Sequence, residues 1–167
     1  MVKVHLLVGP VGAGKSTLAA ELAREHQAVR LTLDEWMTQL FRPDRPDEGV
    51  VPWYIERAER CVAQIWRVAQ AILAAGRDVV LEIGLLQRSA REDFYARIDA
   101  HGVPLVVHVV DAPREVRRER VLRRNVERGE TFAVEVPPAF FEFASDRWEP
   151  VAEREAEGRD VRFVWTG

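Results

Sequence analysis

Short apolar segments alternate along the chain with longer segments in which apolar residues recur every three or four positions. The short segments are rich in Val, Leu and Ile, as is typical of strands buried on both faces of a sheet. We expect such strands at residues 2–8, 28–33, 78–83, 104–110 and 160–165. The periodic segments predict helices directly after the first strand and at residues 34–41, 53–75, 89–101, 114–127 and 139–147. Alternating buried strands and helices predict an α/β fold with a doubly wound, five-stranded parallel sheet.

Glycine, proline and aspartate mark the boundaries of these elements. Gly76 and Gly102 directly follow two of the expected helices, where glycine commonly ends a helix. Residues 42–52 contain three prolines and a glycine, so they are expected to form a loop. Asp34 stands where it could cap a short helix. No repeat, linker or low-complexity tract interrupts the 167 residues, which are therefore expected to form a single domain.

The composition is that of an ordinary globular protein, with 47% hydrophobic and 31% charged residues. A net charge of −3 gives no general attraction to nucleic acid, although it does not exclude a local basic groove. Nucleic acid is therefore an unlikely partner. The lone Cys61 excludes an intramolecular disulfide and a cysteine-rich zinc site, and it is expected in the core. No signal peptide or membrane span is visible, so a cytoplasmic protein is expected.

The most specific motif is the sequence GPVGAGKS at residues 9–16, which matches G-x-x-x-x-G-K-[ST] between a strand and a helix. In such a P-loop, backbone N–H groups and the helix N-terminus bind anionic phosphates. Lys15 would reach the β- and γ-phosphates of ATP, and the Ser16 hydroxyl would bind Mg²⁺. Thr17 is a weaker candidate for a phosphate contact. The residues expected to bind the nucleotide here are Gly9, Gly12, Ala13, Gly14, Lys15, Ser16 and Thr17.

Three acidic residues lie at the carboxyl ends of expected strands, the edge at which open α/β sheets bind ligands. Asp34 follows the second strand, where it could contact a substrate as well as cap a helix. Glu82 ends the third strand, either as a buried, hydrogen-bonded carboxylate or as an acid that orients Mg²⁺ or its water shell. Asp111 precedes Ala112 and Pro113, and a turn or capping role is favoured for it.

Arginines crowd the expected helix at residues 114–127. Arg117, Arg120, Arg124 and Arg128 are spaced three or four residues apart and so share one helical face. A solvated, salt-bridged face is the plain alternative. The preferred interpretation is a short arginine-rich lid at about residues 124–138, in which Arg124 and especially Arg128 stabilise charge on the transferring phosphoryl group. Arg120 is expected to flank the nucleotide base.

Several segments together resemble a known family. The P-loop, Thr32-Leu33-Asp34, residues 124–129 and Trp148-Glu149-Pro150 make the chain similar to small P-loop kinases of the AAA_33 type. That group is similar to zeta toxins, chloramphenicol phosphotransferase and the kinase half of polynucleotide kinases. The resemblance covers nearly the whole chain and implies a P-loop NTPase fold of the nucleoside-monophosphate-kinase-like type. It also implies that Asp34 contacts the acceptor hydroxyl, and that Arg124 and Arg128 contact the phosphates.

One departure from the family bears on the acceptor. Polynucleotide kinases carry a polar Asp-Thr-Asn-like step after the third strand, whereas residues 82–86 here read EIGLL. This difference weakens the case for a polynucleotide acceptor and indicates a less polar pocket. Trp36, Phe41, Trp53 and Tyr54 flank the proline-rich segment and are weak candidates for the wall of that pocket, since aromatic residues are more often core.

These features predict an ATP-dependent kinase that moves the γ-phosphoryl group to a hydroxyl of a small molecule, with Mg²⁺ as cofactor. The absence of an Asn/Thr-Lys-x-Asp sequence favours ATP over GTP. Two alternatives stay open. One is a P-loop ATPase or nucleotide switch acting on a partner protein, against which stands the lack of a clear hhhhD Walker B strand. The other is a toxin-like or nucleic-acid 5′-hydroxyl kinase, which the acidic balance disfavours.

Overall fold

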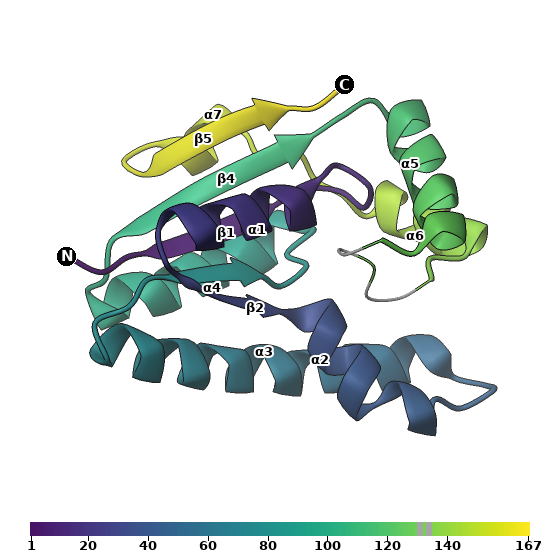
Figure 1. Cartoon of the computed structure of the whole chain (residues 1–167), viewed down its shortest axis with the longest axis horizontal. Helices are drawn as coiled ribbons and strands as arrows, with labels where there is room; N and C mark the ends of the chain where they lie inside the picture. Colours follow the sequence, from purple (N-terminus) through teal and green to yellow (C-terminus); the bar gives the residue numbers. More distant parts are fainter. Residues whose placement is uncertain (130–131, 133–134) are drawn as a thin grey trace.

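Five parallel strands form one sheet in the order β2-β3-β1-β4-β5 (Figure 1). The computed structural model describes residues 1–129, 132 and 135–167. Every neighbouring pair of strands in the sheet is parallel. The predicted five-stranded parallel sheet is therefore confirmed. The strands are β1 (Val4–Val8), β2 (Val29–Thr32), β3 (Val79–Glu82), β4 (Leu105–Asp111) and β5 (Asp160–Trp165).

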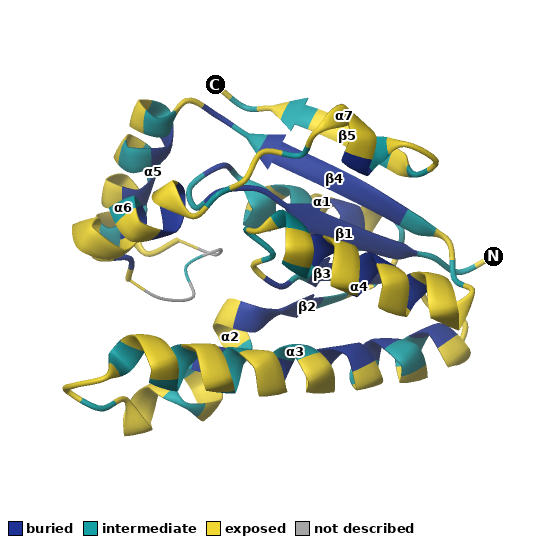
Figure 2. Cartoon of the chain, turned by 180° about the vertical axis from the view of Figure 1, so that it is seen from behind, coloured by how far each residue is buried: buried dark blue, intermediate teal, exposed yellow. Residues whose placement is uncertain are grey.

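Helices cover both faces of the sheet, as Figures 1 and 2 show from opposite sides. Helix α1 (Lys15–Glu25) connects β1 to β2 on one face, while α3 (Val50–Ala74) and α4 (Arg88–His101) pack on the other. The remaining helices lie toward the carboxyl ends of the strands or beside β5. These are α2 (Leu33–Leu40), the 3-10 turn η1 (Arg42–Asp44), α5 (Arg114–Glu127), α6 (Pro138–Asp146) and α7 (Glu153–Ala156).

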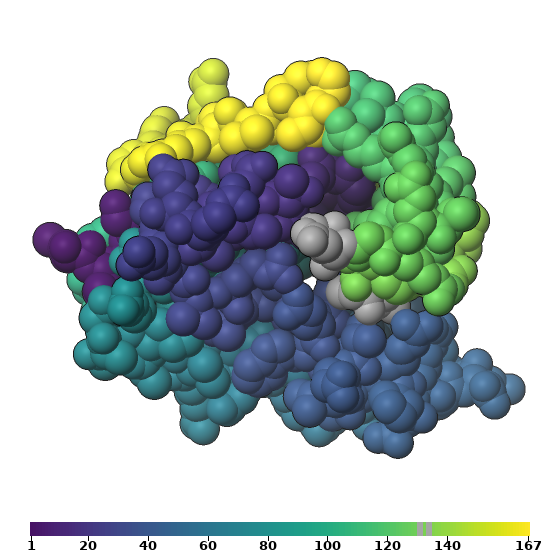
Figure 3. All heavy atoms as spheres, viewed as in Figure 1, coloured from purple at the N-terminus to yellow at the C-terminus, as the bar shows by residue number. Residues whose placement is uncertain are grey.

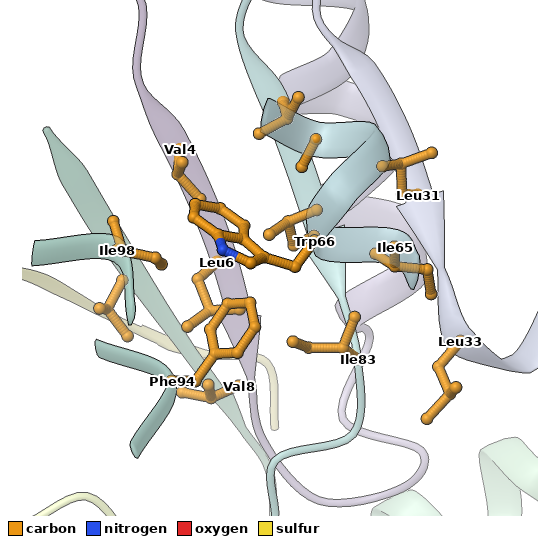
Figure 4. Packing of buried hydrophobic residues seen from close by; sticks show 14 of the residues in the cluster. Val4, Leu6, Val8, Leu31, Leu33, Ile65, Trp66, Ile83, Phe94 and Ile98 are labelled. Carbon is orange, nitrogen blue, oxygen red and sulfur yellow. The ribbon is translucent and has the colours of Figure 1, made fainter. Parts of the chain in front are cut away.

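Strand β1 shows why the central strands are mostly apolar. Val4, Leu6 and Val8 contribute to the core on the α3 and α4 face, whereas Leu7 packs with residues of α1 on the other. Because both faces are covered, all five residues of β1 are buried. In the larger part of the core, between the sheet and helices α3 and α4, the Trp66 ring meets the Phe94 ring edge to face, with their centroids 5.7 Å apart (Figure 4).

Several predicted boundaries need correction. Helix α2 begins at Leu33 after Thr32, so Asp34 lies inside its first turn and is not its cap. The segment expected to be a loop at residues 42–52 contains η1 and the start of α3, because Pro52 is accommodated in the first turn of that helix. Helix α7 was not predicted. The predicted lid at residues 124–138 includes positions 130, 131, 133 and 134, which lie outside the described residues.

Two smaller expectations can be compared with the structure. Cys61 is buried as a free thiol in α3, which confirms its place in the core. Among the helices at residues 1–129 and 135–167, none combines the length and apolar character needed to cross a membrane.

Candidate active site

The P-loop connects the end of β1 to the start of α1, and its backbone depends on glycine. Gly9 and Gly12 both have positive φ angles, of 153° and 81°. A Cβ atom on Gly9 would lie 2.0 Å from the Val110 carbonyl oxygen, and one on Gly12 would lie 2.6 Å from the Arg117 carbonyl oxygen. Only glycine fits at these two positions. Gly14, in the left-handed conformation, then caps the N-terminus of α1.

Lys15 lies across this loop. Its Nζ donates hydrogen bonds to the carbonyl oxygens of Gly9 and Pro10, both at 2.8 Å. Burial lowers the pKa of the Lys15 ammonium below its usual range, while the negative charges of Glu82 and Asp34 oppose that shift. The lysine is therefore a partly desolvated cation between the phosphate-binding loop and two carboxyl groups.

Glu82 and Ser16 form the part of the site that suits a hard cation. Ser16 Oγ donates a hydrogen bond of 2.7 Å to Glu82 Oε1. The other oxygen, Glu82 Oε2, is buried and has no hydrogen-bond partner in the described part of the chain. The same is true of Thr32 Oγ1, and Thr32 lies beside Glu82 where β2 pairs with β3. Burial raises the pKa of Glu82. Oxygen atoms arranged in this way fit a Mg²⁺ ion with its water shell.

Asp34, in the first turn of α2, is electrostatically coupled to Lys15 and Glu82. Asp34 is exposed to solvent, yet the surrounding protein desolvates its carboxyl group enough to raise its pKa. The positive charges of Lys15 and Arg124 oppose this shift. Tyr54 of α3 belongs to the same neighbourhood, because burial and then the Asp34 charge raise the pKa of its phenol above the usual range.

The predicted arginine face of α5 separates into residues with different surroundings. Arg124 acts electrostatically on both Lys15 and Asp34, and its Nε is buried without a hydrogen-bond partner among the described residues. Arg128 lies just past the last residue of α5, in the left-handed conformation, where it pairs with Glu135 at 3.6 Å and stacks on Phe132. Its contact with the phosphates stays a prediction, and this structure favours Arg124 for that role.

Arg117 has a role that sequence reasoning missed. Its guanidinium group is buried and donates to the carbonyl oxygens of Ala112 and Val11, both at 3.0 Å, and to Ser145 Oγ at 3.1 Å. Val11 belongs to the P-loop. Arg117 therefore fixes the loop from behind, as a positioning residue, and does not contribute to a solvated face. Nothing in its sequence position distinguishes it from the other arginines of α5.

Arg120 reaches the P-loop indirectly, through Thr166, the residue directly after β5. One guanidinium nitrogen of Arg120 donates to Thr166 Oγ1 at 2.8 Å, and that hydroxyl donates to the Ala13 carbonyl oxygen at 2.7 Å. Arg120 is thus adjacent to the nucleotide-binding loop, which is compatible with the predicted contact to the base. Thr17, the weaker candidate, is exposed on α1.

Asp111 has the turn role that was favoured for it. Its Oδ1 accepts a 2.7 Å hydrogen bond from the Ala112 amide, and its Oδ2 accepts one of 3.3 Å from the Trp148 indole. The adjacent Glu149 holds the loop after β3, because its amide donates to the Leu86 carbonyl oxygen at 3.0 Å. Glu149 Oε2 also accepts from the Arg88 amide at 2.7 Å. The Trp148-Glu149-Pro150 motif therefore has a structural function here.

The surface is hollowed between the P-loop, α5 and α2, which are drawn in purple, green and blue (Figure 3). An open groove of about 580 Å³ lies along α2. Of the four aromatic residues proposed for the acceptor pocket, Trp36 lines this groove and Tyr54 lies near Asp34. The other two, Phe41 and Trp53, stack on the guanidinium of Arg57. The residues that line the groove are Glu35, Trp36, Thr38, Gln39, Leu40 and Phe132.

Residues 4–141 match the model of the AAA_33 family, described as an AAA domain. This match spans most of the chain, and the chain therefore belongs to the AAA_33 family. A comparison with curated proteins gives no match.

Solved structures share the fold at low sequence identity. A candidate kinase from Chloroflexus aurantiacus J-10-fl gives a TM-score of 0.74 at 18% identity, over 98% of this chain and 85% of that one. Kti12 from Chaetomium thermophilum, solved with ADP-AlF3, gives 0.69 at 15% identity, over 97% and 88%. A sugar kinase from Janibacter sp. HTCC2649 gives 0.61 at 19% identity, over 99% and 86%. The fold is thus the P-loop kinase fold that was expected.

Proposed function

We propose that this protein is an ATP-dependent kinase that transfers the γ-phosphoryl group to a hydroxyl of a small molecule. The observation that carries the proposal is that Asp34, in the first turn of α2, is electrostatically coupled to Lys15 of the P-loop and to Arg124 of α5. Binding of the nucleotide phosphates alone needs only backbone N–H groups and cations. A solvent-exposed carboxyl group coupled to these cations is a group that can orient an acceptor hydroxyl.

In this reaction the acceptor oxygen forms a bond to the γ-phosphorus, and the bond from that phosphorus to the bridging oxygen of ADP breaks. The hydroxyl proton passes to the Asp34 carboxylate, and the products are ADP and a phosphate monoester. Because phosphoryl transfer has a loose transition state, orientation of the hydroxyl by Asp34 contributes more than early removal of its proton. The raised pKa of Asp34 also makes it a stronger base than an ordinary aspartate.

Cations hold and neutralise the phosphates. Lys15 and the amides of the P-loop bind the β- and γ-phosphates, and Arg124 stabilises charge on the group in transfer. Ser16 and Glu82 are the residues that would hold Mg²⁺. Thr32, next to Glu82, would contact the water molecules around the ion. When bound, Mg²⁺ supplies positive charge that neutralises the phosphate oxygens.

The residues near Asp34 and along α2 suit a small acceptor molecule that has both polar and apolar groups. Tyr54 presents a phenol near Asp34, and Trp36 with Leu40 adds apolar surface in the groove along α2. Glu35 and Gln39 provide polar groups in the same groove. A ligand that carries hydroxyls on a partly apolar frame suits this combination.

The direct test measures ATP consumption and product formation with a panel of hydroxyl compounds, including sugars, nucleosides and aminoglycoside- or phenicol-type antibiotics. Phosphorus NMR and mass spectrometry identify any phosphate monoester. We expect slow basal ATP turnover that increases at least about tenfold with one class of compound. Turnover that no hydroxyl compound changes, but that a protein partner does, would instead support the ATPase or switch alternative. Phosphorylation of a 5′-hydroxyl oligonucleotide would support the nucleic-acid alternative.

A further inference from the structure

A second cluster of polar side chains lies at the opposite end of the sheet from the P-loop. His5 of β1, His26 at the end of α1 and Asp78 just before β3 each offer one ligand atom, and these atoms all lie within 4.8 Å of one another. His5 is four residues before Gly9, which corresponds to about 13 Å along an extended strand. The cluster is therefore separate from the nucleotide site.

His5 Nε2 is the central atom of this cluster. The His5 side chain is 1% exposed, and its Nε2 has no hydrogen-bond partner among the described residues. The nearest carboxylate oxygen, Asp78 Oδ2, is 3.8 Å away, which is too far for a hydrogen bond. Two ligands of one tetrahedral zinc ion lie about 3.4 Å apart when each bond is about 2.1 Å long. The observed gap thus fits a shared cation better than a direct contact.

The residues around the cluster hold its members in place. His5 Nδ1 lies 3.1 Å from Nε2 of the buried His108, and with the proton on Nδ1 the lone pair of His5 Nε2 faces the cluster. Asp78 Oδ1 accepts a 3.0 Å hydrogen bond from the Lys3 amide, which leaves Oδ2 facing His5. The His26 ring stands 4.4 Å from the His5 ring. Histidine ligands of metal ions commonly have such a hydrogen bond on the second nitrogen.

The charges of the cluster suit a divalent ion. His5 is buried away from water, which favours the neutral imidazole that binds metal. Lys3 and Arg162 are the nearby cations that oppose metal binding, and Arg162 is paired with Asp160 at 3.1 Å. Asp78 supplies the negative charge.

We propose that His5, His26 and Asp78 form a binding site for a divalent transition-metal ion of the zinc class, with water as a further ligand. Two imidazoles and one carboxylate are ligands that Zn²⁺ and Co²⁺ accept. The ion would join the end of α1 to the starts of β1 and β3. It would therefore stabilise the helix whose other end carries the P-loop.

The test uses the untagged chain after treatment with a chelator, titrated with Zn²⁺ in competition with a chromogenic chelator. The variants are His26→Asn and Asp78→Asn, because His26 is half-buried and asparagine at 78 keeps an oxygen for the Lys3 amide. His101→Asn, at an exposed histidine of α4, is the matched control. Glu82→Gln reports any binding at the P-loop, and circular dichroism checks that each variant is folded.

We expect one Zn²⁺ per chain, with affinity reduced about a hundredfold in His26→Asn and Asp78→Asn and unchanged in His101→Asn and Glu82→Gln. Zn²⁺ at a hundred times its dissociation constant should raise the Tm by about 5–10 °C. Co²⁺ should give the visible absorption of a tetrahedral site. Sub-stoichiometric binding by the parent protein, parent-like affinity in both cluster variants, or loss of binding in Glu82→Gln would each overturn the proposal. If asparagine at 78 prevents folding, His26→Asn alone decides.

Discussion

Ser16 Oγ and Glu82 Oε1 are 2.7 Å apart, so a hydrogen bond joins the first turn of α1 to the end of β3. Strand β3 is paired with β1 in the sheet, with Glu82 beside Leu7. This strand pairing brings the Glu82 carboxyl group next to the Ser16 hydroxyl. The segment Val79–Glu82 thus supplies an acid at the end of a buried strand without the hhhhD sequence. The absence of that motif therefore does not argue against an ATPase.

Glu82→Gln should weaken binding of MgATP and reduce transfer about a hundredfold, while binding of ATP without Mg²⁺ stays the same. Glutamine keeps an oxygen that can accept from Ser16 but removes the charge that would attract the cation. Isothermal calorimetry with and without Mg²⁺ measures both affinities. Glu21→Gln, at an exposed acid of α1, is the control. Equal loss of affinity with and without Mg²⁺ would contradict a metal-holding role.

Lys15→Ala should abolish transfer and weaken ATP binding, because Lys15 is the only side-chain cation within residues 9–16. The change should leave stability unaltered or increase it, since burial disfavours the charged form of this lysine. The chain has one other lysine, Lys3, at the far end of the sheet, and Lys3→Ala is the matched control. Calorimetry and a coupled assay measure the two effects. Unchanged ATP affinity in Lys15→Ala would remove the basis of the P-loop assignment.

Arg124→Ala should lower kcat with little change in the KM for ATP, at a cost of about 3 kcal/mol in transition-state stabilisation. The reason is that Arg124 already acts on Lys15 and Asp34 in this structure. Arg123→Ala, at the exposed neighbour on α5, should have little effect. Steady-state kinetics of both variants and of Arg128→Ala rank the three arginines. A larger effect at Arg128 would show that the end of α5 rearranges when substrate binds.

Arg117→Met should lower the free energy of unfolding by about 3 kcal/mol, because it leaves buried carbonyl oxygens without their donor. Since one of these belongs to Val11, ATP affinity should fall as well, although Arg117 is not expected to touch the nucleotide. Urea denaturation and calorimetry measure the two effects. Arg118→Met is the control, at a partly exposed arginine that pairs with Glu142. Loss of stability with full ATP affinity would show that Val11 does not depend on Arg117.

The positions of strands and helices could be predicted from the sequence because burial on two faces and helical periodicity leave clear patterns. The range of α5 was predicted as Arg114–Glu127 and that of β5 as Asp160–Trp165, the bounds that the structure has. Helix α3 began earlier than predicted because Pro52 was read as a loop residue, whereas proline is tolerated in a first helical turn. Helix α7 has only four residues, which is too short for a periodic signal.

The site was predictable where local motifs define it and unpredictable where tertiary contacts do. The P-loop and the strand-end acids Asp34 and Glu82 follow from sequence position alone. Arg117 and Arg124 look alike in sequence, but Arg117 packs behind the loop, whereas Arg124 is electrostatically coupled to Lys15 and Asp34. The link from Arg120 through Thr166 to Ala13 joins residues up to 153 positions apart, and no local pattern indicates it.

Asp34 also links function to stability. Its pKa is raised in the folded state, so the protonated form favours folding below the pKa of the unfolded chain, and this contribution is lost as pH rises through the folded pKa. Asp34→Asn should therefore unfold at a higher temperature than the parent protein at neutral pH. In acid, where the parent carboxyl is protonated, the difference should disappear.

The most direct test of the account is the rate of phosphoryl transfer by Asp34→Asn to the best acceptor found in the panel of hydroxyl compounds. Single-turnover kinetics at neutral pH, with MgATP affinity measured alongside, separate the chemical step from nucleotide binding. We expect MgATP affinity to be retained and transfer to fall about a hundredfold or more, while the slow acceptor-independent hydrolysis changes little. Transfer at the parent rate would contradict the account, because Asp34 would then have no part in handling the acceptor.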